Sequence, residues 1–320
     1  MLPNFLHYFS AILALGLATI GGGLGQGLAG MNALQAMERQ QLGRDNTFKA
    51  MLIGLALIES GIVIALVMSL LMLLGAPKEI TLEISLSELG IGLAIGLAAL
   101  STSIASSFVV SAATQGIGRQ PFFAQKIITL MLLCQSIIEA PVLFSFIISL
   151  LIKTTINDNM VVIDGVKNLA AGLVIGLASI GPSIGQALFC QAACTAVSAN
   201  KNAYNKIFPF ALFGQAFIET PIIFCLLLAL MFLFSVPTLG TMFFPQGPVI
   251  LTAAVTLGLG ALGTGAGIGL SASRSCEQIA QEPNNYPLMI KLTLLTSTFI
   301  ESSVIYAMIV SFLLILKISS

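Results

Sequence analysis

Long apolar stretches alternate with short polar breaks along the chain, and the alternation repeats eight times. Each apolar stretch exceeds the roughly 20 residues that an α-helix needs to cross a bilayer. Continuous apolar runs indicate helices, because strands of a membrane barrel are shorter and alternate in polarity. We therefore predict an all-α membrane protein with eight transmembrane helices, near Phe5–Ala36, Phe48–Gly75, Ile84–Ile117, Phe122–Ile152, Leu169–Ser198, Ile207–Val236, Val249–Ser275 and Leu288–Leu316.

Every second apolar segment carries the same short pattern, two apolar residues, a glutamate and a small residue, first as Leu57-Ile58-Glu59-Ser60. The four acids are Glu59, Glu139, Glu219 and Glu301, at steps of 80, 80 and 82 residues. A fixed period of this kind marks internal repeats. We predict four tandem helical hairpins at residues 1–80, 81–160, 161–240 and 241–320, with linkers near Ala76–Ser85, Thr154–Lys167 and Pro237–Pro248.

The composition agrees with a membrane protein and points to a function for the four acids. The chain is 57% apolar and 8% charged, whereas soluble domains carry about 25% charged residues. Lys+Arg and Asp+Glu both number 13, so there is no basic field for a nucleic acid. A charged side chain at membrane depth costs roughly 3 kcal/mol on insertion scales. A chain that carries this cost four times in one register is expected to use these groups.

The first helix of each hairpin carries small residues at every second position. Residues two apart lie about 200° apart on a helix, so this pattern lines two opposite faces. Small residues let a neighbouring helix approach closely, here on both sides. The pattern therefore favours a closed ring of helices over a compact bundle. The positions are Gly21, Gly23, Gly25 and Gly27, then Ser101, Ser103, Ala105 and Ser107, then Gly181, Ser183, Gly185 and Ala187, and finally Gly263, Gly265, Gly267 and Gly269.

A glycine-rich helix, a polar loop and a second helix with one embedded acid together resemble the rotor-ring proteolipid of F-type ATP synthases, the c-subunit. The resemblance covers nearly the whole chain, as four hairpins fused in one chain. The loops Arg39-Gln40, Gly118-Arg119-Gln120-Pro121 and Gln281-Glu282-Pro283 carry it, while Asn200-Lys201-Asn202 departs from the pattern. V-type proteolipids, the related alternative, commonly lose one acid of a double hairpin. Retention of all four acids favours the F-type interpretation.

The resemblance implies a rotor component without catalytic site or cofactor, which carries H⁺ on reversibly protonated Glu59, Glu139, Glu219 and Glu301. Its implied partners are membrane lipid, other copies in a ring, the stator a-subunit with an essential arginine, and the central stalk. The stalk would contact the loop residues Arg39, Gln40, Arg119, Gln120 and Pro121. Three chains would give twelve hairpins, within the usual range of the resembled rings.

The charges outside the apolar segments predict the orientation of the chain. The loops within hairpins hold nine Lys and Arg residues, and the termini and linkers hold four. The positive-inside rule then places the loops in the cytoplasm and both termini outside. We expect a multi-pass protein of a bacterial inner membrane.

The transported ion is predicted from the residues that surround each acid. Sodium needs several oxygen ligands, whereas a proton needs the carboxylate and one acceptor. Gln26 and Gln186 each lie 33 residues before an acid, which keeps a Na⁺ site open at Glu59 and Glu219. Ile268 at the matching place offers no ligand, and one ion must serve all four sites, so we favour the proton. Further candidate ligands are Ser60, Gln135, Gln215, Thr220, Ser302 and Tyr306, although the hydroxyls could equally bond their own helix.

Two other functional classes fit the pattern less well. A secondary transporter with internal repeats would work as one chain around a midplane site, and a structural scaffold would carry its acids incidentally. Four equivalent acids argue against both. No metal site is expected, because the five cysteines lack metal-ligand spacing and His7 is the sole histidine. We expect the cysteines to serve packing, His7 to lie at the membrane boundary, and Pro141 and Pro221 to free a backbone carbonyl one turn earlier and kink the outer helices.

Overall fold

A computed structural model describes residues 1–75, 79–157, 159–234 and 243–319. Within these ranges the chain forms four antiparallel helical hairpins, and eight spans are long and apolar enough to cross a membrane. The all-α membrane fold is thus confirmed. The hairpins are α1 (Leu2–Arg39) with α2 (Arg44–Leu74), α3 (Leu82–Arg119) with α4 (Ala124–Ile138) and α5 (Ala140–Thr155), α6 (Val162–Ala199) with α7 (Tyr204–Phe234), and α8 (Phe243–Gln281) with α9 (Tyr286–Ser319).

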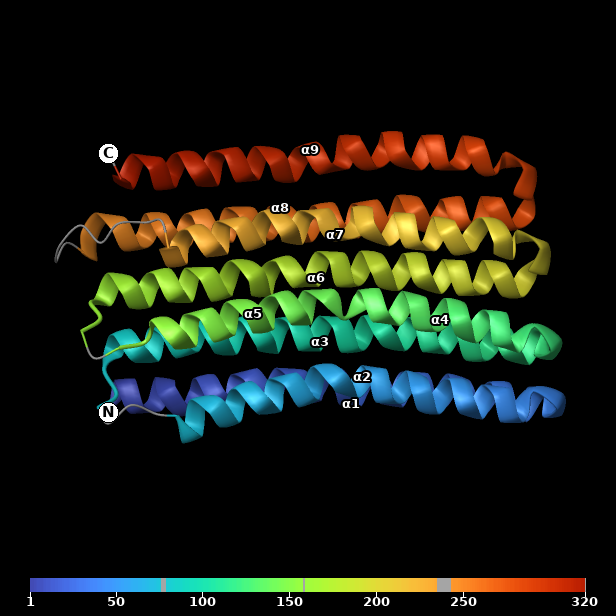
Figure 1. Ribbon diagram of the computed structural model, residues 1–320, viewed down its shortest axis with the longest axis horizontal. Coiled ribbons are helices and arrows are strands. Elements are labelled where there is room, and N and C mark those ends of the chain that lie inside the picture. The colour runs from blue at the N-terminus through green and yellow to red at the C-terminus, as the bar shows by residue number, and fades with distance from the viewer. Residues whose placement is uncertain (76–78, 158, 235–242, 320) are drawn as a thin grey trace.

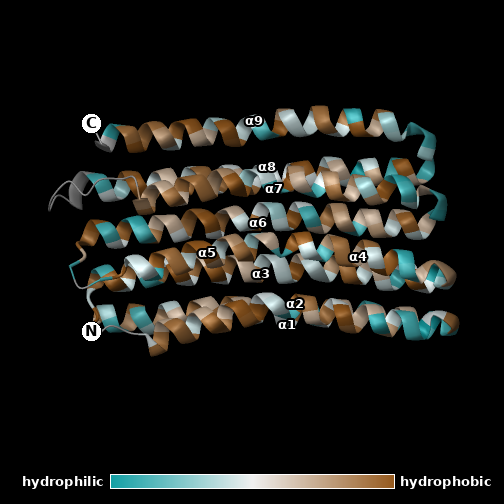
Figure 2. Ribbon diagram, in the orientation of Figure 1, coloured by the Kyte–Doolittle hydropathy of each residue, from teal (hydrophilic) through white to brown (hydrophobic). Residues whose placement is uncertain are grey.

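The hairpins stand side by side in two layers. Helices α1, α3, α6 and α8 pack against one another in succession and form the inner layer, and their hairpin partners form the outer layer. The hairpin turns lie at one end of the molecule, and both termini lie at the other (Figure 1). The turn end is hydrophilic, whereas the middle of the helices is largely hydrophobic (Figure 2). This is the distribution that a bilayer-spanning array requires.

Each hairpin turn is a single turn of 3-10 helix, at η1 (Gln41–Gly43), η2 (Pro121–Phe123), η3 (Lys201–Ala203) and η4 (Pro283–Asn285). Proline opens two of them, because the first position of a helix has no use for the missing N–H. In the other two turns, the polar side chain just before the 3-10 helix caps it by accepting a hydrogen bond from a backbone N–H. The side chain of Gln40 accepts from Leu42 N at 3.4 Å, and that of Asn200 accepts from Asn202 N at 3.1 Å.

The inner helices approach one another as closely as their small residues allow. A Cβ atom added at Gly21 would lie 2.5 Å from Leu100 Cα of α3, and one at Gly25 would lie 2.6 Å from Ser103 O. Helix α6 is approached on both sides, through Gly172 from α3 and through Gly185 from α8. The two small faces of the sequence pattern therefore serve two neighbours.

The linkers are shorter than predicted, because α3, α6 and α8 already begin inside the ranges Ala76–Ser85, Thr154–Lys167 and Pro237–Pro248. The polar residues that resemble linkers in composition lie in the first helical turns. Acidic side chains are stabilising at that place, next to the unpaired N–H groups and the positive end of the helix dipole. In α6, Asp164 Oδ2 accepts from Val161 N at 3.3 Å. Residues 237–242 of the last predicted linker lie outside the described residues.

The outer helix of hairpin 2 is interrupted at its acid, as expected from the proline. Helix α4 ends at Ile138, and α5 begins at Ala140. Pro141 has no N–H to donate to Ile137, and its ring would clash with that carbonyl. In hairpin 3, α7 runs without a break from Tyr204 to Phe234 with Pro221 inside it, so the kink predicted there stays a prediction.

Candidate functional site: four membrane-embedded glutamates

The four acids belong to one structural register. In hairpins 1, 3 and 4 the isoleucine just before the acid packs against the same small position of the inner helix. The distances from a Cβ built on that glycine to the isoleucine Cγ2 are 3.4 Å for Gly25 and Ile58, 3.0 Å for Gly185 and Ile218, and 3.3 Å for Gly267 and Ile300. In hairpin 2, Ser103 contacts the first hairpin instead, by donating to Ile58 O at 3.2 Å. The inner helices therefore set the height of the acids.

Two of the acids face the outer helix of the preceding hairpin. Ser60 of α2 lies beside Glu139, and Thr220 of α7 lies beside Glu301. In each case the hydroxyl comes from the residue that follows the preceding acid, so neighbouring acids stand at nearly the same height. The sequence pattern paired each hydroxyl with its own acid, whereas the structure brings it to the next one along the chain.

Glu219 has the most complete surroundings of the four acids. Gln186 of α6 is fully buried, and its Nε2 donates to Glu219 Oε1 at 2.9 Å. This contact is the one that the spacing of 33 residues predicts. The other glutamine of the hairpin, Gln215, donates to Ala211 O of its own helix at 3.2 Å.

Glu139 has a buried carboxyl group without a hydrogen-bond donor among the described residues. Both of its carboxyl oxygens are buried and have no hydrogen-bond partner among the described residues, and the same holds for the Ser106 hydroxyl. Gln135 turns away, since its Nε2 donates to Gly54 O of hairpin 1 at 3.3 Å. A buried carboxyl group without donors suits the protonated form, because desolvation penalises the bare anion.

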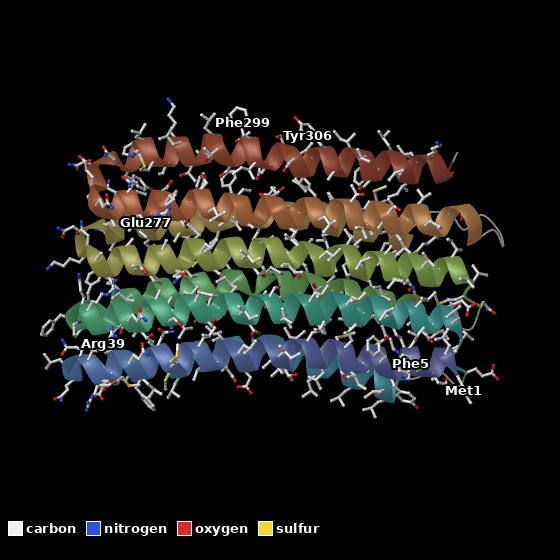
Figure 3. All side chains as sticks on the ribbon, turned by 180° about the vertical axis from the view of Figure 1, so that it is seen from behind. Met1, Phe5, Arg39, Glu277, Phe299 and Tyr306 are labelled. Atoms are coloured by element: carbon white, nitrogen blue, oxygen red, sulfur yellow. The ribbon has the colours of Figure 1, made fainter. Side chains whose placement is uncertain are left out.

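Glu59 and Glu301 lie in the two edge hairpins. Glu59 is exposed and Gln26 is half-buried, because α1 and α2 form the edge of the hairpin array in the described structure. Near Glu301, Ile268 is fully buried at the position of Gln26 and offers no polar atom. Tyr306, considered as a partner of Glu301, is 65% exposed and points outward from α9 (Figure 3).

The hydroxyls next to the acids bond to backbone carbonyls of their own helices. Ser60 donates to Leu57 O at 2.7 Å, Ser302 donates to Phe299 O at 2.7 Å, and Thr220 donates to Ala216 O at 3.4 Å. Serine and threonine commonly bond in this way inside helices. The carboxylate is thus the polar group that all four sites share.

The loop residues gather at the turn end of the molecule, away from the acids. Arg39 and Arg119 end α1 and α3 and are exposed, and Figure 3 shows Arg39 at that end. Gln120 links two hairpins, since its Nε2 donates to Ser198 O at 2.7 Å, while Pro121 opens η2 and is half-buried. Gln40 is half-buried as well. The loops therefore leave charged side chains free to meet a partner.

A second group of charges lies outside the motifs that the sequence repeats. Glu88 of α3 is fully buried, and its Oε2 lies 2.5 Å from Nδ1 of His7, which is 1% exposed. Lys153 of α5 lies 3.7 Å from the other carboxyl oxygen. The placement of His7 at the membrane boundary stays a prediction, and the structure adds that its ring is buried and paired with a carboxylate. Glu88 belongs to none of the repeating motifs, so the repeat pattern gave no signal for it.

Comparison with known proteins assigns the family. The family of the ATP synthase C-subunit matches the chain four times, at residues 9–72, 89–152, 169–232 and 251–314. The chain is 40% identical over 79 residues to the chloroplastic ATP synthase c-subunit of Emiliania huxleyi, which covers 25% of this chain and 96% of the relative. It is 40% identical over 77 residues to the ATP synthase c-subunit of Geotalea uraniireducens, covering 24% and 85%.

Another relative, the chloroplastic ATP synthase c-subunit of Oedogonium cardiacum, is 40% identical over 72 residues, which are 22% of this chain and 87% of the relative. Each relative corresponds in length to about one hairpin. Proteins of this family are membrane components of the rotor and are not themselves catalytic. The chain therefore belongs to the ATP synthase c-subunit family, as an integral membrane proteolipid in which four of the family's hairpins are fused.

Proposed function

We propose that this chain carries protons through a rotary ATP synthase on Glu59, Glu139, Glu219 and Glu301. The observation that supports the proposal most is the common register of the acids, in surroundings whose shared polar group is the carboxylate. Desolvation penalises a bare anion, so an acid facing lipid is stable when protonated or paired with a cation. It would release its proton where a stator arginine and a water path compensate the charge.

The energy for rotation would come from the membrane potential. A unit charge that crosses 100 mV releases about 2.3 kcal/mol. Protons would enter by one half-channel of the stator a-subunit, travel on the turning ring and leave by the other. The loop residues Arg39, Gln40, Arg119, Gln120 and Pro121 would hold the central stalk on the cytoplasmic side, with both chain termini on the opposite side of a bacterial inner membrane.

The two edges of the hairpin array support assembly with further copies of the chain. A Cβ atom built on Gly265 or Gly269 of α8 would clash with α6. A Cβ atom built on the matching Gly23 or Gly27 of α1 would meet no atom of the described residues within 4 Å. At the opposite edge, a Cβ atom built on Gly263 of α8 would also meet no described atom within 4 Å, whereas one built on the matching Gly181 of α6 would clash with α8. The last inner helix of one copy is therefore shaped to receive the first inner helix of the next.

Closure with another copy would also complete the first ion site. Glu139 and Glu301 each lie beside a hydroxyl of the preceding hairpin, whereas hairpin 1 forms the edge of the array and Glu59 has no such neighbour among the described residues. In a head-to-tail ring, Ser302 of the neighbouring copy would take that place. Every acid would then lie between two outer helices.

A sodium-coupled rotor is the second candidate, and one contact favours it. The Gln186 amide on Glu219 leaves Gln186 Oε1 buried without a donor, and an amide oxygen is a suitable ligand for a hard cation. Because Ile268 replaces this glutamine in hairpin 4, the proton remains the ion that all four sites are equipped to carry.

Treatment of the purified protein with a hydrophobic carbodiimide tests the proposal, because this reagent modifies protonated carboxyl groups in apolar surroundings. We expect peptide mass spectrometry to find the label on all four glutamates and, at fixed pH, little protection by sodium. Glu88 is an internal control, since it is buried but paired with His7 and Lys153.

Strong protection of all four sites by millimolar sodium would contradict the proton and favour the sodium rotor. Protection restricted to Glu59 and Glu219 would show instead that the sites differ in ion preference. Labelling of Glu88 together with an unlabelled set of four would contradict the assignment of the acids altogether.

A further inference from the structure

A buried charge cluster joins hairpins 1 and 2 far from the rotor acids. Its anion, Glu88, is fully buried between two basic side chains, His7 at 2.5 Å and Lys153 at 3.7 Å. Lys153 also donates to Gly75 O, at the end of α2, at 3.2 Å. The cluster thus ties together α1 and α2 of hairpin 1 with α3 and α5 of hairpin 2.

The cluster lies at the end of the molecule that holds the termini. His7 precedes Gly25, which marks the height of the first rotor acid, by 18 residues. At 1.5 Å per helical residue this is about 27 Å along the helix axis. The group is therefore separate from the proposed ion path and needs an explanation of its own.

The energetics of a buried anion suggest a role in holding the hairpins together. Glu88 could not remain charged in this place without its partners, because an uncompensated buried charge is strongly unfavourable. Both hairpins supply groups to the cluster, so separating them would expose or orphan the carboxylate. Charges on adjacent elements are engaged elsewhere or lie further out, since Lys167 pairs with Asp164 at 3.4 Å and Glu83 is half-buried.

Neighbouring hairpins of the chain meet at three junctions, and the ionic contact between His7 and Glu88 occurs at the first of them. The matching positions at the next junction form a neutral contact, in which Asn168 Nδ2 donates to Ser87 Oγ at 3.0 Å. At the third junction the matching residues are Lys167 and the fully buried, apolar Ile250. In a ring, the junction between copies would bring together Val249 and Tyr8. The contact is thus ionic at the first junction and a neutral hydrogen bond at the second, and at the third one of the two matching residues is apolar.

We propose that His7, Glu88 and Lys153 form an ionic clasp that fixes hairpin 1 against hairpin 2. The clasp makes this the most strongly coupled of the hairpin junctions and gives each chain one marked junction. It acts at the terminal end of the helices, where α1 and α3 are also joined by a hydrogen bond from Ser85 Oγ to Pro3 O at 2.9 Å, and it does not depend on which ion the rotor carries.

Hydrogen–deuterium exchange of the whole chain in detergent tests the clasp. Glu88→Gln leaves the shape of the side chain but removes the charge, and we expect the first turns of α1 and α3 to exchange about 10-fold faster or more. Lys153→Gln, a milder change at a partly exposed side chain, should give a smaller increase in the same turns. Glu83→Gln, in the first turn of α3, is the matched control and should raise exchange only slightly, by the lost interaction of its charge with the helix dipole.

A double variant separates the clasp from a general loss of packing. His7→Leu with Glu88→Leu removes both fully buried polar partners and leaves only the partly exposed Lys153, so its exchange should be slower than that of Glu88→Gln. Equal exchange in Glu88→Gln, Lys153→Gln and Glu83→Gln would overturn the proposal. An acceleration that is as large in the first turns of α6 and α8 would overturn it as well. If Glu88→Gln does not fold, the comparison of hydrogen–deuterium exchange between Lys153→Gln and Glu83→Gln tests the proposal instead.

Discussion

Replacing any one of the four glutamates by glutamine is expected to abolish ion-driven ATP synthesis, and not to lower it by a quarter. Every copy in the ring would carry the inactive hairpin, and the ring cannot turn past the stator without loading and releasing an ion at each position. Glu219→Gln is the most informative variant, because the amide should retain the contact with Gln186 that the structure shows at 2.9 Å. Membrane vesicles with an imposed proton gradient provide the measurement.

The control for this experiment is a carboxylate that lies outside the proposed path. Glu277 is partly exposed at the turn end of α8 and pairs with Arg274 at 2.7 Å, so Glu277→Gln should keep nearly full activity. A loss of about one quarter in each of the four glutamate variants would contradict a common path. Full activity in any one of them would remove that acid from the mechanism.

Ring closure is expected to fail when the open face of α1 is filled. Within the chain Gly27 meets nothing within 4 Å, so Gly27→Leu should leave each chain folded. In a ring the new side chain would collide with the neighbouring copy, because the matching Gly269 packs directly on Gly185 inside the chain. We expect chains of normal thermal stability that remain unassembled in native mass spectrometry.

Two other glycine variants serve as controls for Gly27→Leu. Gly25→Leu should destabilise the chain itself, by about 1–3 kcal/mol for overpacking, because its Cβ would lie 2.6 Å from Ser103 O. Gly30→Ala should have little effect, since the larger Val110 and Cys190 occupy the matching positions in hairpins 2 and 3. If Gly27→Leu assembles as well as Gly30→Ala, copies do not meet through this face.

The eight spans, the four acids and the small inner positions were all predictable from the sequence, because they repeat. A period of about 80 residues turns weak local signals into a strong one, and the length of an apolar run is a physical requirement of the bilayer. The helix starts were predicted too late, since polar residues in a first turn resemble a linker in composition while the helix dipole favours them there.

Contacts between hairpins were less accessible to sequence reasoning. Spacing identified Gln186 as a partner of its acid, but it could not show that Gln135 turns to Gly54 O of another hairpin. It also paired Ser60 with Glu59, whereas the hydroxyl lies beside Glu139. The pair of His7 and Glu88 breaks the repeat, so it leaves no periodic signal, and helical periodicity alone does not say which neighbour a face meets.

The number of hairpins in the assembled ring tests the central claim most directly. Each chain supplies four hairpins, and the open faces of α1 and α8 lead to head-to-tail assembly of whole chains. With helix axes about 8–10 Å apart, each added chain widens the inner circle. Electron microscopy of rings in detergent should therefore show a hairpin count divisible by four, and we expect three chains and twelve hairpins. A count that is not divisible by four, or a single chain closed on itself, would contradict the account.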